Sequence, residues 1–391
     1  MQIPPGDVDI LRGLGEQVAE IASLPIQQER RELKARIDRL EQAKPPVHIY
    51  QEPWNELNVE GELDLHCQEN FCRGIEQNLR RTLYKWRHYQ GDMIVGEAMV
   101  QPLCIVDTGF GIREDVDIRK TSESSDVVSR HFHIQIKEES DAEKIQFPRV
   151  HHDVAKTEEQ FEARSQIFEG IMPVVKQGVG SFWFNPWDDL VRWTGVQEVL
   201  MDMALRPDYV HKIVDRLVSA WICRLDQYEE QGLLTVPCKE MWGVGAAQIF
   251  SEVSPAMHRE FALQHEARWY SRFGWTYYGC CEPLHNKVDI IREAFPNLKK
   301  ISMSPWVDFS VAVPKVGSDL IFAWKPNPAW LASETWQPEE VRRYLHEHLE
   351  QALGGGCVME IHLKDISTVR WEPQRLWEWA RLADEVTAEF A

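Results

Sequence analysis

The chain has 391 residues, of which 43% are hydrophobic and 27% charged, and this composition is that of an ordinary globular protein. Its 43 basic and 62 acidic side chains give a net charge of −19, which argues against nucleic acid or an anionic membrane as the partner. Eight cysteines are no disulfide framework at this length, no apolar run reaches the roughly 20 residues of a membrane span, and the first residues lack the pattern of a secretory signal. We therefore expect a cytoplasmic protein with reduced thiols.

Residues 1–45 are predicted to form a helical extension. Leu33, Ile37 and Leu40 recur at helical spacing with charged residues between them, and the pattern ends before Lys44-Pro45-Pro46. The main domain is predicted to span residues 46–391.

From residue 47 onward, short apolar runs alternate with longer amphipathic segments. Ser254-Pro255 and Pro338 are typical helix starts, and glycines follow the helix that Pro338 opens. Strands alternating with helices predict parallel βαβ units, and eight strands suit a closed (β/α)8 barrel of the TIM type. The predicted strands are residues 47–50, 93–95, 180–184, 234–237, 275–279, 300–303, 320–324 and 357–363.

Residues 111–150 differ from this pattern because they are polar and alternating. The run SRHFHIQIKEES predicts a hairpin-like insertion with His131, His133, Gln135 and Lys137 on one face. This insertion is either a solvated hairpin or a lid over the mouth of the barrel.

Four segments in the C-terminal half carry a family resemblance. In chain order they read VPCKEMWGVG, SEVSPAMHREFALQHEARWYSRFGWTYYGCCEP, FAWKPNPAWLA and TWQPEEVRRYLHEHLEQALGGG. Together they resemble the uroporphyrinogen decarboxylase superfamily over residues 180–390, and more weakly over 46–180. The resemblance implies a (β/α)8 barrel that acts either as a decarboxylase or as a cobalamin-dependent methyltransferase that uses zinc.

The sequence also departs from both kinds of active site in that superfamily. The arginine-rich segment with which the decarboxylases hold their substrate has no counterpart near residues 47–57. The methyltransferases carry a His-x-Cys motif where this chain reads Tyr278-Gly279-Cys280, so Tyr278 replaces a zinc ligand. Their later cysteine corresponds to Lys364 by position, and His362 is the nearest residue able to replace it as a ligand.

Cys280, Cys281 and Glu282 follow the predicted strand 275–279, at the strand end where barrels of this type place their active sites. A thiolate is both a zinc ligand and a nucleophile, although two buried thiols acting as small hydrophobic groups are the alternative. Glu240 follows the predicted strand 234–237 and is either a ligand, an acid/base group or a solvated loop residue. A zinc site with three protein ligands would use Cys280, His362 and either Glu240 or Cys281.

The last predicted strand has one ionisable face. Glu360, His362 and Lys364 alternate with apolar residues, which is unusual in a strand buried on both sides. Without a metal, His362 and Lys364 are predicted to act as acid/base groups, so these three residues and Tyr278 join Glu240 as catalytic candidates.

Several tryptophans at or just beyond predicted strand ends indicate a pocket with aromatic walls for a flat, uncharged ligand. With Glu282, the predicted substrate-binding residues are Trp183, Trp187, Trp242, Trp306 and Trp324.

Three functions remain open on this basis. The first is a methyltransferase component that demethylates a small methylated or methoxylated compound with the help of zinc and passes the methyl group to a corrinoid on a partner protein. The second is a decarboxylase or other lyase acting on a small carboxylic acid. The third is a non-catalytic binding protein of the same fold. The oligomeric state is also open, with a homodimer as one option.

Overall fold

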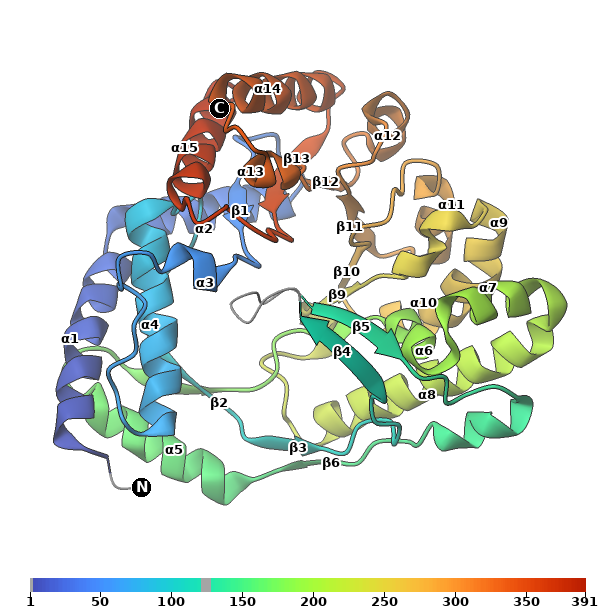
Figure 1. Ribbon diagram of the computed structural model, residues 1–391, viewed down its shortest axis with the longest axis horizontal. Coiled ribbons are helices and arrows are strands. Elements are labelled where there is room, and N and C mark those ends of the chain that lie inside the picture. The colour runs from blue at the N-terminus through green and yellow to red at the C-terminus, as the bar shows by residue number, and fades with distance from the viewer. Residues whose placement is uncertain (1–2, 121–127) are drawn as a thin grey trace. The chain divides into compact units, whose positions relative to one another are not determined.

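The computed structural model describes residues 3–120 and 128–391 (Figure 1). The chain divides into two compact units. Unit 1 comprises Met1–Pro102, Val154–Gln177 and Ala323–Ala391, and unit 2 comprises Leu103–Asp153 and Gly178–Phe322. A parallel sheet has the strand order β1-β13-β12-β11-β10-β9-β8, and the division between the units falls within β12. The chain is therefore an α/β protein with a seven-stranded parallel sheet.

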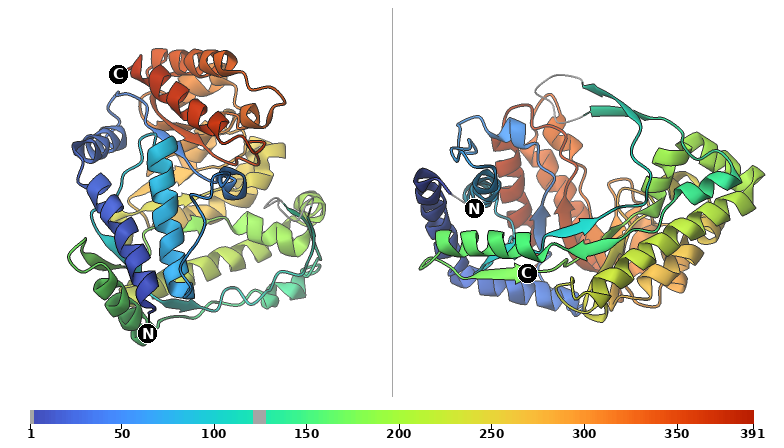
Figure 2. Two further views of the ribbon diagram at one scale, coloured as in Figure 1. Left: turned by 60° about the vertical axis from the view of Figure 1, so that its left-hand side comes forward. Right: turned by 90° about the horizontal axis from the view of Figure 1, so that it is seen from below.

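Unit 1 contains the first and last strands of this sheet, which pair in parallel so that His48 lies beside His362. Helices α1 and α4 pack side by side, because both bury an apolar stripe at helical spacing (Figure 2). In α4 this stripe includes Cys72, Ile75 and Leu79. The strands of unit 1 are β1 (Val47–Ile49), β2 (Met99–Pro102), β7 (Val174–Gln177), β13 (Val358–Leu363) and the end of β12 (Ile321–Trp324). Its helices are α1 (Pro5–Ala22), α2 (Pro25–Asp38), α3 (Trp54–Leu57), α4 (Asn70–His88), α5 (Val154–Ile167), α13 (Ala329–Ala332), α14 (Pro338–Gly354) and α15 (Gln374–Ala388).

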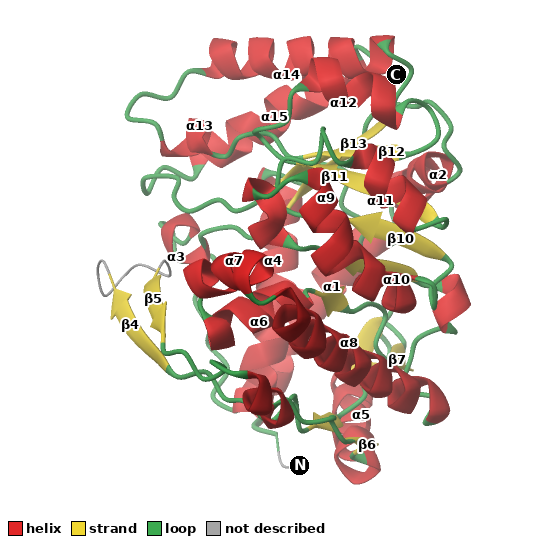
Figure 3. Ribbon diagram, turned by 90° about the vertical axis from the view of Figure 1, so that its right-hand side faces the viewer, coloured by secondary structure: helices red, strands yellow, loops and turns green. Residues whose placement is uncertain are grey.

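Unit 2 contains β8 to β11, with α8, α10 and α11 over one face of these strands (Figure 3). The side chains of Phe184 in β8 and Tyr278 in β10 pack against Tyr270 of α10. The strands of unit 2 are β3 (Ile105–Asp107), β4 (Val116–Lys120), β5 (Val128–Phe132), β6 (Val150–His152), β8 (Trp183–Phe184), β9 (Trp242–Gly245), β10 (Trp275–Tyr278) and β11 (Leu298–Met303). Its helices are η1 (Glu139–Lys144), α6 (Pro186–Thr194), α7 (Val196–Leu205), α8 (Pro207–Glu230), η2 (Cys238–Glu240), η3 (Gln248–Glu252), α9 (Pro255–His258), the π turn η4 (Arg259–Leu263), α10 (Gln264–Tyr270), α11 (Val288–Ala294) and α12 (Phe309–Val316).

Six of the eight predicted strands are confirmed within a few residues, as β1, β8, β10, β11, β12 and β13. The prediction for 93–95 is wrong, since these residues form no strand. The prediction for 234–237 is also wrong: only Leu234 makes an isolated bridge, and the strand β9 begins at Trp242. Pro237 lacks a backbone N–H, whereas the small Gly243 and Gly245 in β9 allow close packing against neighbouring elements. The closed eight-stranded barrel stays a prediction.

The N-terminal segment is helical as predicted, but it forms two helices because Pro25 begins α2. The hairpin is confirmed as the antiparallel pair β4 and β5, whose connection lies outside the described residues. Strand β5 ends at Phe132, so of the four residues predicted on one face only His131 lies within the strand. No helix in the described part of the chain has the length and hydropathy that a bilayer span requires.

Candidate functional site

In unit 1, the paired ends of β1 and β13 bring polar side chains together. The Nε2 atom of His362 lies 2.7 Å from Oε1 of Glu360, and its Nδ1 atom lies 3.1 Å from the hydroxyl of Tyr50. The ring centroids of His48 and His362 are 5.1 Å apart. The sequence prediction that Glu360 and His362 share a strand face agrees with this hydrogen bond, but it missed Tyr50 and His48. The available signal was that His48 and Tyr50 also alternate with apolar neighbours.

These hydrogen bonds define the state of the imidazole. The side chain of Glu360 is only 5% exposed and, as a carboxylate, accepts a hydrogen bond from Nε2–H of His362. In the neutral ring, Nδ1 is then the acceptor for the hydroxyl proton of Tyr50. Both ring nitrogens of His362 therefore have protein partners in this arrangement.

The backbone takes an unusual conformation immediately after both strands. Gln51 and Asp365 have φ values of 59° and 56°, a left-handed conformation that costs free energy in residues other than glycine. Each directly follows a polar residue of the cluster, Tyr50 and Lys364 respectively. The ammonium of Lys364, which is 7% exposed, lies 3.2 Å from the carboxylate of Asp365. Such conformations concentrate at functional sites.

Trp324, at the end of β12, faces the helices of unit 1. Its ring is fully buried and stacks on His348 of α14, with 5.1 Å between centroids. The next residue, Lys325, is only 4% exposed and was missed by the sequence prediction. By strand alternation, Lys325 extends from the opposite face to Trp324.

In unit 2, the end of β10 carries two adjacent thiols. The Sγ atoms of Cys280 and Cys281 are 3.5 Å apart, with Cys280 buried and Cys281 exposed. The backbone N–H of Cys280 donates to Glu282, and its carbonyl accepts a hydrogen bond from Ser302. Gly279, with φ of 103°, ends the strand and breaks its alternation. The predicted residues Cys280, Cys281 and Glu282 therefore lie together at the carboxyl end of a parallel strand.

Tyr278 faces the helices of unit 2. Its hydroxyl lies 2.8 Å from Nε2 of His258, and its ring packs against Tyr270 and Phe295. Burial raises the pKa of Tyr278 well above its ordinary value. The neighbouring Tyr277 is on the other face, where the ammonium of Lys300 lies 5.3 Å from its ring centroid.

Around Tyr278 lies a buried polar cluster that the sequence prediction missed. Burial raises the pKa of Glu266 to about 8 and lowers that of His258 to about 3. The side chains of Glu266 and Tyr270 are both fully buried, and the hydroxyl of Tyr270 has no hydrogen-bond partner among the described residues. Lys287, whose pKa is lowered by burial, donates to the carbonyl of Phe250. In sequence, Glu266 reads as an ordinary surface residue of a helix.

A second group missed by the prediction lies at the carboxyl ends of β8 and β9. Asp188 accepts hydrogen bonds from the side chains of Asn185 and Gln248, at 3.2 Å and 3.0 Å. Burial raises the pKa of Asp188 and raises that of its neighbour Asp189 to about 6. These carboxylates are candidates for acid/base chemistry.

The remaining predicted residues of unit 2 are spread over it. Trp187 is fully buried against Phe250, whereas Trp183 and Trp306 are 42% and 69% exposed. Glu240 and Trp242 precede or begin β9, so they lie at the amino end of that strand, opposite to the end expected from the wrong strand 234–237. Their proposed roles stay predictions.

Groups able to hold a metal ion need several His, Cys, Asp or Glu side chains close together. In the part of the chain that the structure describes, no three His, Cys, Asp or Glu side chains gather closely enough to hold a metal ion. Cys280 and Cys281 belong to unit 2 and His362 to unit 1, and their predicted role as zinc ligands stays a prediction.

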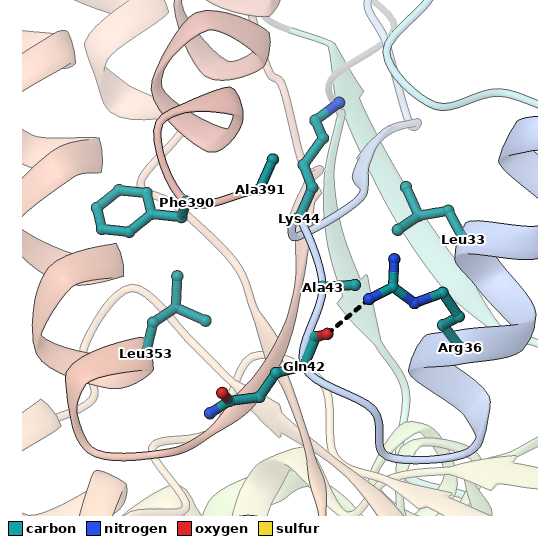
Figure 4. A pocket seen from close by; sticks show the side chains of 8 residues that line it. All are labelled: Leu33, Arg36, Gln42, Ala43, Lys44, Leu353, Phe390 and Ala391. Atoms are coloured by element: carbon teal, nitrogen blue, oxygen red, sulfur yellow. Dashed lines mark hydrogen bonds between the residues drawn. The ribbon is translucent and has the colours of Figure 1, made fainter.

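None of the predicted site residues lines the cavities found in the described part of unit 1. The first, about 380 Å³, lies beside α2 and the C-terminal residue, where Arg36 donates to the carbonyl of Gln42 (Figure 4). The second, about 370 Å³, is lined largely by apolar side chains of α4 and of the segment leading into β2.

The chain is similar to a known protein in its fold but not in its sequence. No protein-family model matches the chain, and no curated protein matches it in sequence. Among solved structures, it is similar to a methyltransferase from Methanosarcina mazei, with a TM-score of 0.52 and 12% sequence identity. The match covers 90% of this chain and 96% of the other, so it extends to both units.

Proposed function

We propose that the chain is a methyltransferase that removes a methyl group from a small methylated or methoxylated compound and passes it to a corrinoid on a partner protein. The observation that carries the proposal is the pair of thiols at the carboxyl end of β10, with Sγ atoms 3.5 Å apart. Support comes from the fold, which is similar to that of a methyltransferase over 90% of the chain. Fold likeness alone does not define an activity, so the thiols are the groups to test.

The two thiols are suited to soft chemistry at a methyl carbon. A thiolate is a strong nucleophile and a ligand for soft metal ions. Cys281 is exposed and accessible to a bound molecule, while the backbone of Cys280 is fixed by Glu282 and Ser302. If zinc is bound, it would polarise the oxygen of the methyl donor. Because no three donors gather in the described residues, we assign no step to it.

The test is formation of methylcobalamin from cob(I)alamin and a panel of methoxylated compounds, followed by its visible spectrum. We expect Cys280→Ala and Cys281→Ala each to lower the rate at least about 100-fold, because a positioned nucleophile or ligand is lost. Cys223→Ala, in α8, is the matched control and should leave the rate unchanged.

Elemental analysis of the same proteins tests the metal separately. About one zinc per chain that is lost in Cys280→Ala would support the zinc-assisted form of the reaction. Full activity in both cysteine variants would overturn the methyl-transfer proposal.

The buried lysines of unit 1 favour a second candidate, a lyase acting on a small carboxylic acid. Lys325 and Lys364 are 4% and 7% exposed and lie just beyond the ends of β12 and β13. Cationic groups at these positions would bind a carboxylate. Release of CO2 from small carboxylic acids, without methyl transfer, would favour this candidate.

A further inference from the structure

We propose that Tyr50, His362 and Glu360 form a proton relay that exchanges a proton with a molecule bound at the carboxyl ends of β1 and β13. In this relay, Tyr50 is the group that contacts the bound molecule, and His362 and Glu360 position its proton. The relay rests on the lyase candidate, whose buried lysines lie in the same unit, because lyase chemistry requires a proton at a reacting atom.

A continuous hydrogen-bonded path supports the relay. It runs from the Glu360 carboxylate over 2.7 Å to His362, and over 3.1 Å to the hydroxyl of Tyr50. Since His362 uses Nε2 for Glu360 and Nδ1 for Tyr50, a proton passing through the imidazole leaves or enters at Tyr50. A nucleophile or acid held by a base, which is itself oriented by a third group, is the arrangement of catalytic triads.

The burial of the charged end of the path also supports the relay. The side chain of Glu360 is 5% exposed and that of His362 is 12% exposed, and Tyr50 is half-buried like His362. The carboxylate of the relay is therefore more enclosed than the imidazole. A carboxylate taken out of water costs free energy unless a partner satisfies it, which is the part that His362 plays.

The backbone conformation next to Tyr50 also supports the relay. Gln51, directly after Tyr50, holds a left-handed conformation, as does Asp365 after Lys364. Both strands therefore end in conformations that only the surrounding structure maintains. They fix where Tyr50 leaves β1.

The proton balance of the relay is simple. When His362 carries two ring protons, Nε2–H donates to Glu360 and Nδ1–H donates to Tyr50. When CO2 leaves the bound acid, the electron pair of the broken C–C bond stays on the bound molecule. Tyr50 then gives its hydroxyl proton to the resulting anionic atom and takes the Nδ1 proton of His362 in return. The products are CO2, the protonated molecule, an intact tyrosine and a neutral imidazole, and Glu360 remains a carboxylate throughout. The reverse sequence removes a proton from the bound molecule.

Other ionisable groups of unit 1 lie on or beside β1 and β13. His48 lies beside His362 from β1, and the ion pair of Lys364 with Asp365 lies at the end of β13. Behind β1, the ammonium of Lys85 contacts both the carbonyl of Ile49 and the carboxylate of Glu52. These groups stay in place in the variants below, so the comparison isolates the relay.

The experiment is NMR of protein labelled with 13C at the tyrosine Cζ atoms, whose shifts report the state of the hydroxyl. Tyr50→Phe assigns the resonance of Tyr50. In the unmodified protein we expect the chemical shift of this resonance to change with pH as His362 is protonated. This pH-dependent change should be absent from His362→Asn and from Glu360→Gln. Glu360→Asp, which keeps the carboxylate, should retain it.

The relay would be overturned if the pH-dependent change of the Tyr50 resonance persisted unchanged in His362→Asn. It would also be overturned if the unmodified protein showed no such change. Circular dichroism shows which variants are folded, and the aspartate variant keeps the test valid if the glutamine variant is not. This result does not depend on turnover, so it stands apart from the assay of CO2 release. Once turnover is measured, Tyr50→Phe should lower kcat about 100-fold with little change in KM.

Discussion

The carboxyl group of Glu266 is enclosed within unit 2, and its environment strongly raises its pKa. Its side chain is fully buried in α10, and burial raises its pKa to about 8. At pH 7 it is therefore mostly protonated in the folded protein, whereas in the unfolded chain it ionises near pH 4.5. Since the folded state binds the additional proton, this group lowers the free energy of unfolding as the pH rises from about 4.5 to about 8.

Replacing Glu266 by glutamine should remove this pH dependence. Relative to Glu266→Gln, we expect the unmodified protein to lose up to about 1.4 kcal/mol of stability per pH unit between pH 5.5 and 7.5. His258 acts in the opposite sense below pH 6.5 because its pKa is lowered, so the difference between the two proteins is the quantity to measure. Urea unfolding at several pH values gives it.

The exposed Glu260, in the π turn just before α10, provides the control. Glu260→Gln should follow the pH profile of the unmodified protein. An equal slope in the unmodified protein and in Glu266→Gln would contradict the assignment of a raised pKa to this group.

The sequence predicted which side chains share a face where the alternation of a strand is visible. It did not predict contacts that depend on which strands pair. The alternation of residues 359–364 placed Glu360 and His362 on one face, and the structure joins them by a hydrogen bond. Tyr50 was missed because its contact with His362 joins residues 312 positions apart. The orientation of Tyr278 was missed because no sequence pattern marks which face of β10 the helices cover.

Among the elements of unit 2, the contact between β8 and β9 depends on a glycine. A Cβ atom at Gly245 would lie 2.0 Å from the carbonyl oxygen of Phe184 and 2.6 Å from the hydroxyl of Tyr270. By contrast, a Cβ at Gly74, on the exposed side of α4 in unit 1, meets nothing within 4 Å.

The two alanine variants should therefore have opposite effects. We expect Gly245→Ala to destabilise the protein by about 2 kcal/mol or more, since the strands must move apart. Gly74→Ala should stabilise it by about 1 kcal/mol through helix propensity. Thermal unfolding followed by circular dichroism measures both, and an unchanged Tm in Gly245→Ala would show that the backbone yields without cost.

The glycines of β9 also explain why this strand was missed in the sequence. Residues 242–245 contain two glycines, which weaken a strand pattern in sequence, yet they permit the close approach that β9 needs. Residues 234–237 are apolar but include Pro237, and Val236 is 37% exposed. The apolar run 234–237 therefore makes only an isolated bridge, at Leu234, and no strand.

At the scale of the molecule, the net charge of −19 determines the kind of partner that the surface disfavours. We expect no measurable binding to duplex or single-stranded DNA at 50 mM salt, because a polyanion gains no release of counterions from an acidic surface. Fluorescence anisotropy with labelled oligonucleotides checks this. Binding with a steep dependence on salt would reveal a basic patch that the overall charge conceals.

The division of the chain into units has a consequence for its synthesis. Unit 2 ends at Phe322, while unit 1 includes both Met1–Pro102 and Ala323–Ala391, and β1 pairs with a strand that begins more than 300 residues later. On the ribosome, the segments of unit 2 emerge before β13 exists, so unit 2 is free to fold first. During this time β1, in the N-terminal segment, lacks its pairing partner β13. A chaperone that shields this N-terminal segment would therefore act early, and truncation of the last strand would leave the beginning of the protein, rather than its end, exposed to proteases.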